Sequence, residues 1–126
     1  MRHAAARTAS ATSLLPLRTN WFHVLLCLAD GEQHGYGIMQ EVLARTNGKV
    51  RLWPATLYGT LRRLLDEDLI EECARRPVRE TDDLRRRYYR LTSFGGRVLT
   101  AEIGRLEDLL KAARAKRRTL NAEPSR

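Results

Sequence analysis

At 126 residues, 43% of them hydrophobic, the chain is long enough for one domain with a small core and a helical appendage. Its formal net charge of +8 favours polyanionic partners, either nucleic acid or an anionic membrane surface. The longest uninterrupted apolar run covers residues 24–29, which is too short to span a bilayer, so we expect no membrane-spanning segment and no membrane partner.

The side chains that usually carry catalysis or bind metal ions are few and scattered. Cys27 and Cys73 lack the spacing of metal ligands, and Cys27 falls in an apolar segment typical of a small buried side chain. The three histidines do not cluster with carboxylates, and the sequence contains no nucleotide-binding glycine loop. We therefore expect no enzyme, with no catalytic residue, no metal and no cofactor, in a reducing cytoplasm.

Residues 1–13 are rich in Ala, Ser, Thr, Arg and His, with no acidic residue and no apolar period. This composition is shared by disordered basic arms and by organelle transit peptides. We interpret the segment as a disordered basic arm, which is also able to touch DNA phosphates.

The first predicted helix begins near Thr19 or Asn20, either of which can cap it, and ends at Asp30-Gly31. Apolar side chains nearly encircle it, beginning with Trp21. A helix of this kind is buried on most sides, so we expect it to pack against its own domain on one flank and against another chain on the other.

The second predicted helix covers about residues 34–46 and ends at Asn47-Gly48. It opens with His-Gly-Tyr-Gly, whose glycines each cost about 1 kcal/mol of helix stability relative to alanine. In return, they permit close packing or close approach of backbone N–H groups to an anion. Tyr36, between them, either lends its hydroxyl to a phosphate or packs as a half-buried core aromatic.

The third predicted helix, residues 53–67, has Pro54 in its first turn and two unlike faces. At 100° per residue one face carries four leucines: Leu57, Leu61, Leu64 and Leu65. The other face carries small side chains near the start of the helix and two arginines a turn later. Its residues are Ala55, Thr56, Gly59, Arg62, Arg63 and Asp66. Small residues permit close approach to a surface and paired arginines suit phosphates or guanine edges, while the alternative is a solvated basic face.

Two strands, residues 69–75 and 86–91, are predicted to form a hairpin around an exposed turn at 76–84, with Tyr89 and Leu91 facing inward. Arginines flank the tip on both sides: Arg75, Arg76, Arg79, Arg85, Arg86, Arg87 and Arg90. Three helices followed by a charged hairpin predict a mainly α fold, a winged helix-turn-helix over residues 14–91 with a two-stranded β wing. In that fold the third helix enters the major groove and the wing flanks the backbone.

The last predicted helix spans residues 92–118, with Thr92 as its cap and Gly95-Gly96 weakening its first turn; residues 119–126 are expected to form a flexible tail. Its apolar residues follow the 4-3-4-3 spacing of a helix-pairing seam: Leu99, Ile103, Leu106, Leu110 and Ala113. So small a domain cannot cover the whole seam. We therefore expect dimerisation through this helix, with Trp21 near the dimer interface and two recognition helices on one face of DNA.

These segments resemble the PadR family of bacterial transcriptional regulators. HGYGIMQEV, PATLYGTLRRLLDEDLIEE and RRRYYRLTSFG stand in the order and spacing of that family and cover most of residues 21–98. The single C-terminal helix is similar to the compact subfamily. The resemblance implies a homodimeric repressor of the bacterial cytoplasm, associated with the nucleoid. It would bind an inverted-repeat operator in double-stranded DNA and be released by a small-molecule effector or a stress signal.

By motif match, the residues that the resemblance implies at the DNA are Tyr36, Thr56, Tyr58, Gly59, Arg62, Arg86 and Arg87. Arg63 joins them from its place on the basic face of the third helix. The chain departs from the family pattern at Ala55, where glycine is usual, and at Phe94-Gly95. Drug-sensing relatives stack planar ligands on a tryptophan of the last helix, which this chain lacks, so Trp21 is the substitute candidate for ligand binding.

Two other hypotheses fit the same pattern. A winged-helix protein-interaction module would use its basic faces to bind an acidic partner. A ligand-binding dimer whose DNA binding has decayed would need an apolar pocket between the last helices. DNA binding is the hypothesis that assigns a role to both the third helix and the hairpin arginines.

Overall fold

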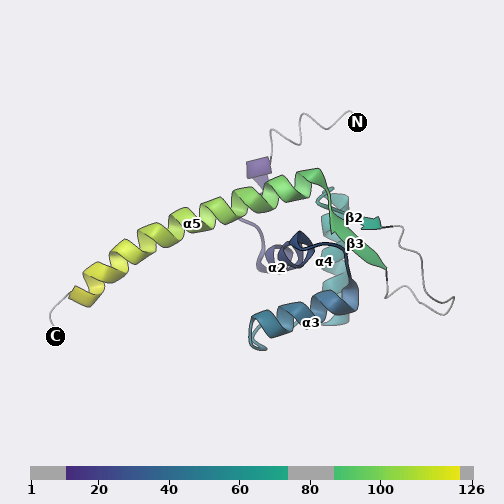
Figure 1. Ribbon diagram of the computed structural model, residues 1–126, viewed down its shortest axis with the longest axis horizontal. Coiled ribbons are helices and arrows are strands. Elements are labelled where there is room, and N and C mark those ends of the chain that lie inside the picture. The colour runs from purple at the N-terminus through teal and green to yellow at the C-terminus, as the bar shows by residue number, and fades with distance from the viewer. Residues whose placement is uncertain (1–10, 74–86, 123–126) are drawn as a thin grey trace.

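The computed structural model describes residues 11–73 and 87–122. A body of short helices and a small sheet lies at one end of the long helix α5 (Ser93–Ala122), which extends far beyond it (Figure 1). The body contains the 3-10 helix η1 (Ala11–Leu14) and three α-helices, α2 (Thr19–Ala29), α3 (Gly35–Arg45) and α4 (Pro54–Asp66). The predicted winged helix-turn-helix is confirmed, with one strand more than expected.

An aliphatic core holds α2, α3 and α4 together. Its fully buried side chains are Val24, Leu25, Ile38, Val42, Leu57, Leu61, Leu64, Leu69, Ile70 and Val98. The leucine face predicted for α4 is confirmed, since three of its leucines are buried and Leu65 is half-buried against the core. The opposite face of α4 is therefore left to solvent.

The sequence predicted the end of α3 correctly but not the cap at the start of α2. α2 begins at Thr19, but its N-cap is Arg18, which makes no side-chain capping bond, so the prediction that Thr19 or Asn20 caps the helix is wrong. Both residues already lie inside the first turn. At the end of α3, Asn47 and Gly48 adopt φ angles of 54° and 80°, which confirms the predicted helix stop.

Three antiparallel strands form the sheet, in the order β1 (Gln33–His34), β3 (Tyr88–Leu91), β2 (Ile70–Cys73). The prediction of two strands missed β1, which pairs with the edge of β3 that a lone hairpin would leave open. Tyr89 is buried, as predicted, and Leu91 is half-buried against the core. The predicted turn and most of the hairpin arginines, Arg86 among them, lie outside the described residues.

The start of α5 is fixed by a cap and a close backbone contact. The Thr92 hydroxyl accepts a hydrogen bond from the Gly95 N–H at 2.9 Å and donates one to the Asp68 carbonyl at 2.6 Å, which confirms the predicted cap. The Leu69 carbonyl accepts from the Thr92 N–H at 3.1 Å and lies so close to Gly95 that a Cβ there would overlap it. Glycine at position 95 is thus a packing requirement.

Regular structure begins earlier in the chain and ends later than the sequence indicated. η1 occupies residues 11–14 and packs on α5, so residues 11–13 of the predicted arm belong to a 3-10 helix; residues 1–10 lie outside the described residues. α5 continues to Ala122, so residues 119–122 are helical and not part of a flexible tail. Every residue from 107 to 122 is exposed.

A buried carboxylate ties the N-terminal segment to α5. Glu102 is only 2% exposed and accepts the Leu17 N–H at 3.1 Å. Arg105 donates to the same carboxylate from Nε at 2.6 Å and from Nη2 at 2.9 Å. The Arg105 hydrogen bonds lower the pKa of Glu102, burial opposes this, and the Leu17 N–H adds to the lowering. The ionised form is therefore the one that the fold binds.

Gly95→Ala should destabilise the fold by about 1–3 kcal/mol, because the added methyl group must push α5 away from Leu69. Gly96→Ala is the matched control, since a Cβ there meets nothing within 4 Å and alanine favours a helix interior. The control should gain up to about 1 kcal/mol. Urea unfolding measures both, and changes of the same sign in the two variants would contradict the contact.

Glu102→Gln should cost about 1–3 kcal/mol at pH 7, because a neutral amide cannot replace the charge bound by Arg105. The folded-state pKa of Glu102 is lowered, so its contribution is complete above the ordinary glutamate pKa of about 4.3 and is lost as the pH falls through the folded value. Unfolding at pH 7 and below pH 4 measures this. Exposed Glu107→Gln is the control, and a pH-independent gap from the wild type would contradict the assignment.

Candidate nucleic-acid interface

The outer face of α4 is exposed as the sequence predicted. Ala55, Thr56 and Gly59 form a low surface near its start, where a Cβ on Gly59 would meet nothing within 4 Å. Arg62 and Arg63 follow a turn later, and neither has an acidic partner in the part of the chain that the structure describes. Successive helical residues point about 100° apart, so the two guanidiniums face different directions.

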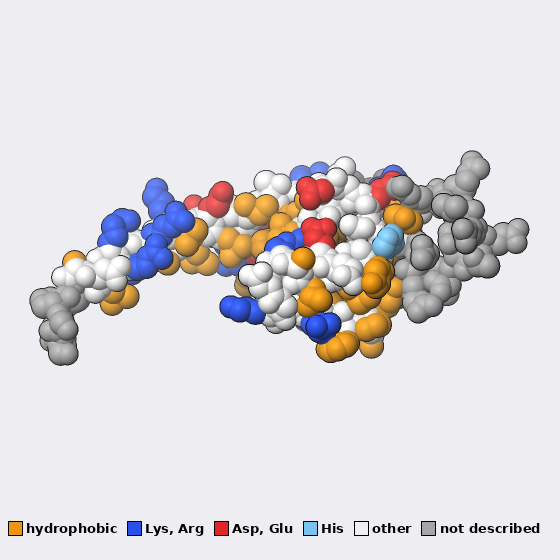
Figure 2. Space-filling view, turned by 60° about the horizontal axis from the view of Figure 1, so that its bottom comes forward, with side chains coloured by type: hydrophobic (Ala, Val, Ile, Leu, Met, Phe, Trp, Pro, Cys, Tyr) orange, Lys and Arg blue, Asp and Glu red, His pale blue; other side chains and the backbone are white. Residues whose placement is uncertain are grey.

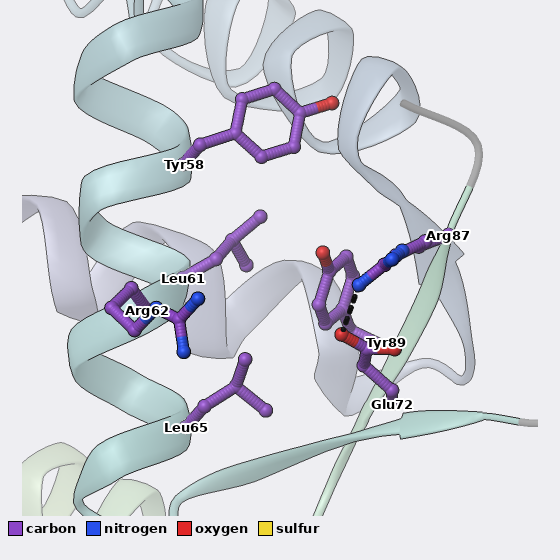
Figure 3. A pocket seen from close by; sticks show the side chains of 7 residues that line it. All are labelled: Tyr58, Leu61, Arg62, Leu65, Glu72, Arg87 and Tyr89. Atoms are coloured by element: carbon purple, nitrogen blue, oxygen red, sulfur yellow. Dashed lines mark hydrogen bonds and ion pairs between the residues drawn. The ribbon is translucent and has the colours of Figure 1, made fainter. Parts of the chain in front are cut away.

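Two open grooves flank this face of α4. The wing groove lies between α4 and the sheet, and Figure 3 shows α4 side chains pointing across it toward the strands. Its main lining residues are Tyr58, Leu61, Arg62, Glu72, Arg87 and Tyr89. The α2 groove lies between α4 and the start of α2. Its main lining residues are Arg18, Asn20, Trp21, Thr56, Gly59 and Arg63.

In the wing groove, the positive charge of Arg87 is paired with the carboxylate of Glu72. Arg87 Nη1 lies 3.1 Å from Glu72 Oε2, and both side chains are about half exposed. Glu72 is the register partner of Tyr89, so Glu72, Tyr89 and Arg87 share one face of the sheet. On the other face, Arg90 pairs with Glu71 at 2.7 Å. The phosphate contact predicted for Arg87 stays a prediction, and a phosphate there must compete with Glu72.

The two tyrosines predicted at the DNA differ in exposure. Tyr36, at the start of α3, is 58% exposed with its ring stacked on His34 at 6.5 Å, so the alternative of a half-buried core aromatic is wrong. The His34 Nδ1 caps α3 by accepting the Gly37 N–H at 2.9 Å. Tyr58 is half-buried, with its hydroxyl against Gly35, where a Cβ would lie 2.7 Å from the oxygen. Tyr58 therefore packs α4 onto α3 at the edge of the wing groove.

The residues predicted for the dimer interface fall in three environments. Leu99 is buried in its own domain, so we no longer place it at an interface with a second chain. Trp21 lies in the α2 groove, whose lining residues come from the start of α2 and from α4, and its place near the dimer interface stays a prediction. The rest lie on the outward part of α5, half-buried or exposed: Ile103, Leu106, Leu110 and Ala113.

Sequence reasoning missed several residues of this surface. Trp53, the N-cap of α4, is 62% exposed, and the Arg51 guanidinium lies 5.0 Å from its ring centroid. A tryptophan side chain cannot supply a capping hydrogen bond, so its presence directly before Pro54 was a signal that the sequence offered. Glu72 gave no such signal in the sequence, because only the pairing of β2 with β3 brings Arg87 close to it.

The described residues show neither a reactive cysteine nor a cluster of metal-binding side chains. Cys27 is buried, as predicted, and burial raises the pKa of its thiol to about 11, although a hydrogen bond from Arg45 opposes the shift. No three His, Cys, Asp or Glu side chains within residues 11–73 and 87–122 gather as a metal site. No helix in that part of the chain is long and apolar enough to cross a membrane.

Comparison with known proteins points to one family. Residues 24–101 match the model of the transcriptional regulator PadR-like family. An uncharacterised protein of Lysinibacillus sphaericus is 33% identical over 92 residues, which cover 68% of this chain and 82% of that protein.

Solved structures share the fold. One is a transcriptional regulator from Clostridium thermocellum, with a TM-score of 0.62 and 23% identity over 76% of this chain and 87% of that one. Another is Bacillus subtilis PadR in complex with operator DNA, with a TM-score of 0.57 and 24% identity. That alignment covers 68% of this chain and 47% of PadR, so the chain corresponds to about half of that protein.

Glu72→Gln should strengthen binding of duplex DNA about two- to five-fold at low salt, because it frees Arg87 and removes a negative charge from the wing groove. Glu71→Gln is the matched control, since it removes the same charge from the opposite face of the sheet. Fluorescence anisotropy with a labelled duplex measures both variants. Equal effects would show that only net charge matters and that Arg87 does not face the DNA.

Proposed function

The chain belongs to the PadR-like family of transcriptional regulators, a family of DNA-binding winged-helix proteins, and from this premise we propose that it is a homodimeric repressor acting on the chromosome in the cytoplasm. Each protomer inserts α4 into the major groove of one half of an inverted-repeat operator. The observation that carries the proposal is the outer face of α4, which combines a low, small-residue start with two arginines free of acidic partners among the described residues.

The roles on α4 follow from position and side-chain chemistry. Thr56 and Arg62 lie on the exposed face where a helix in the major groove meets base edges, and a bidentate arginine contact discriminates a base by about 1–3 kcal/mol. Arg63 points away from Arg62 into the α2 groove. In the proposal it contacts the phosphate backbone of the DNA, together with the exposed Tyr36 at the start of α3. Gly59 keeps the helix surface low, and Tyr58 fixes α4 against α3. Arg86 and Arg87 complete the proposed contacts from the wing.

Dimerisation rests on the outward part of α5. Hydrophobic side chains are exposed along α5 between the domain and a cluster of basic side chains near its far end (Figure 2). Leu110 is 48% exposed, and Ile103, Leu106 and Ala113 continue the same seam. A second copy of α5 would cover these side chains and place two α4 helices on one side of a duplex.

Release of the repressor by a small ligand or a stress signal is part of the proposal through the family resemblance. Trp21, the candidate ligand-binding residue, lies in the α2 groove beside Thr56 and Arg63. A planar ligand stacked on it would occupy the surface that faces DNA, and would not lie between paired α5 helices. Such a ligand would displace DNA by direct competition.

Selection of bound fragments from a random duplex pool tests the proposal. The wild type should enrich a two-fold symmetric sequence, and Thr56→Ala and Arg62→Ala should relax the preference at specific positions. Arg63→Ala should instead weaken binding to all sequences and reduce the salt slope by about 0.9 per bound chain. Equal losses for both groups on selected and random DNA would contradict these roles.

Sedimentation of the same preparation at micromolar concentration tests the two-fold part of the proposal. A monomer, or a selected sequence without symmetry, would contradict the dimer. Failure to enrich any sequence would favour a winged-helix module that binds an acidic protein.

A further inference from the structure

We propose that Arg18, held over the ring of Trp21 at the start of α2, is a second phosphate-binding residue that acts with Arg63 on the side of α4 opposite the wing. The inference rests on the proposed function and deepens it, because it assigns a DNA-backbone contact to a residue that precedes the segment matched by the PadR-like family, residues 24–101. It also gives Trp21 a role as the residue that positions Arg18.

The geometry of α4 requires two flanking contacts. A helix in the major groove has a phosphate backbone on each side of it. Arg62 lines the wing groove and Arg63 lines the α2 groove, so each arginine faces one of the two flanks of α4. The wing supplies Arg87 on the first flank. On the second flank the cation beside Arg63 is Arg18.

The charge of the α2 groove identifies an anion as its occupant. No acidic side chain lines this groove among the described residues, whereas the wing groove contains Glu72 paired with Arg87. Neither Arg18 nor Arg63 has a carboxylate partner in the described part of the chain. The remaining lining residues are small or polar, apart from Trp21, so the groove offers a phosphate hydrogen-bond donors beside the two arginines.

Trp21 holds Arg18 in place. The Arg18 guanidinium carbon lies 5.6 Å from the centroid of the Trp21 ring, within the range of a cation–π contact. The ring is itself half-buried and packed against the core, so it forms a fixed platform. A guanidinium stacked on a ring keeps its N–H groups directed outward in its own plane, which suits a phosphate and lowers the entropy lost on binding.

Folding does not account for an arginine at position 18. Arg18 is the N-cap of α2, with the extended backbone of a capping residue (φ −63°, ψ 149°) and no capping bond from its side chain. Serine, threonine, aspartate or asparagine would satisfy an N–H group of the first turn there. A positive charge at the positive end of the helix dipole is also unfavourable. The residue at this position therefore opposes local stability, as expected where binding determines the choice.

This conflict gives a test with opposite signs. Arg18→Ser supplies the missing cap and removes the charge, so its Tm should rise by a few degrees. Its affinity for a mixed-sequence duplex of about 30 base pairs should fall about three- to ten-fold at low salt, and the salt slope should fall by about 0.9 per bound chain. Arg18→Lys keeps the charge without the planar stacking and should retain the wild-type slope. A role confined to folding would move Tm and affinity in the same direction.

Arg118→Ser is the control, because it removes the same charge from an exposed position near the far end of α5. If Arg18→Ser binds DNA no more weakly than this control while the wild type binds DNA, the inference fails and the proposed function stands. If Arg18→Ser alters dimer dissociation and leaves DNA affinity unchanged, the groove is a protein interface and the inference fails. If the wild type does not bind duplex DNA at all, the proposed function fails first.

Discussion

The contact between the start of α5 and the turn after α4 determines how the two functional parts of the chain are placed. Thr92 binds the carbonyls of Asp68 and Leu69, and Gly95 lies against the second of them. Asp68 itself has a φ of 66°, so the chain leaves α4 through a left-handed residue and returns to it as α5. These few residues fix the start of α5 relative to the end of α4. A two-fold protein can match the spacing of two half-sites only if this placement is fixed.

The chain has a net charge of +8, but its arginines differ in whether a carboxylate pairs with them. On the wing, Glu71 and Glu72 pair with Arg90 and Arg87, so part of the basic charge is held within the sheet when DNA is absent. These pairs are about half exposed and weak, which lets a phosphate replace a carboxylate at small cost. On the α2 side, Arg18 and Arg63 have no acidic partner among the described residues. The α2 side is therefore the more attractive flank for an approaching backbone.

Local patterns in the sequence predicted what depends on local periodicity. The two faces of α4, the stop at Asn47-Gly48 and the cap at Thr92 each follow from residues within one or two helical turns. Long-range contacts left no such pattern. Glu102 accepts the N–H of Leu17 across 85 positions, and β1 exists only because β3 lies beside it. The Gly-Tyr-Gly start of α3 was readable as a close approach, but the partner that fills the space beside Gly35 is Tyr58 of another helix. Helical periodicity likewise showed that Trp21 is apolar, but not that it would line a groove with α4.

The outward part of α5 is helical although nothing in the described chain buries its residues 107–122. Leu99 is already covered by the domain, so any pairing surface begins at Ile103 and extends outward. From residue 107 to 122 the helix has no contact that buries a side chain, and a helical segment of that length is marginal in water without packing. In the proposed dimer, the stability of this segment would be coupled to association with a second copy, and both would depend on protein concentration. The proposed pairing of α5 would also bring the two α4 helices together, so folding of this segment and binding of the proposed two-fold operator would be one linked equilibrium.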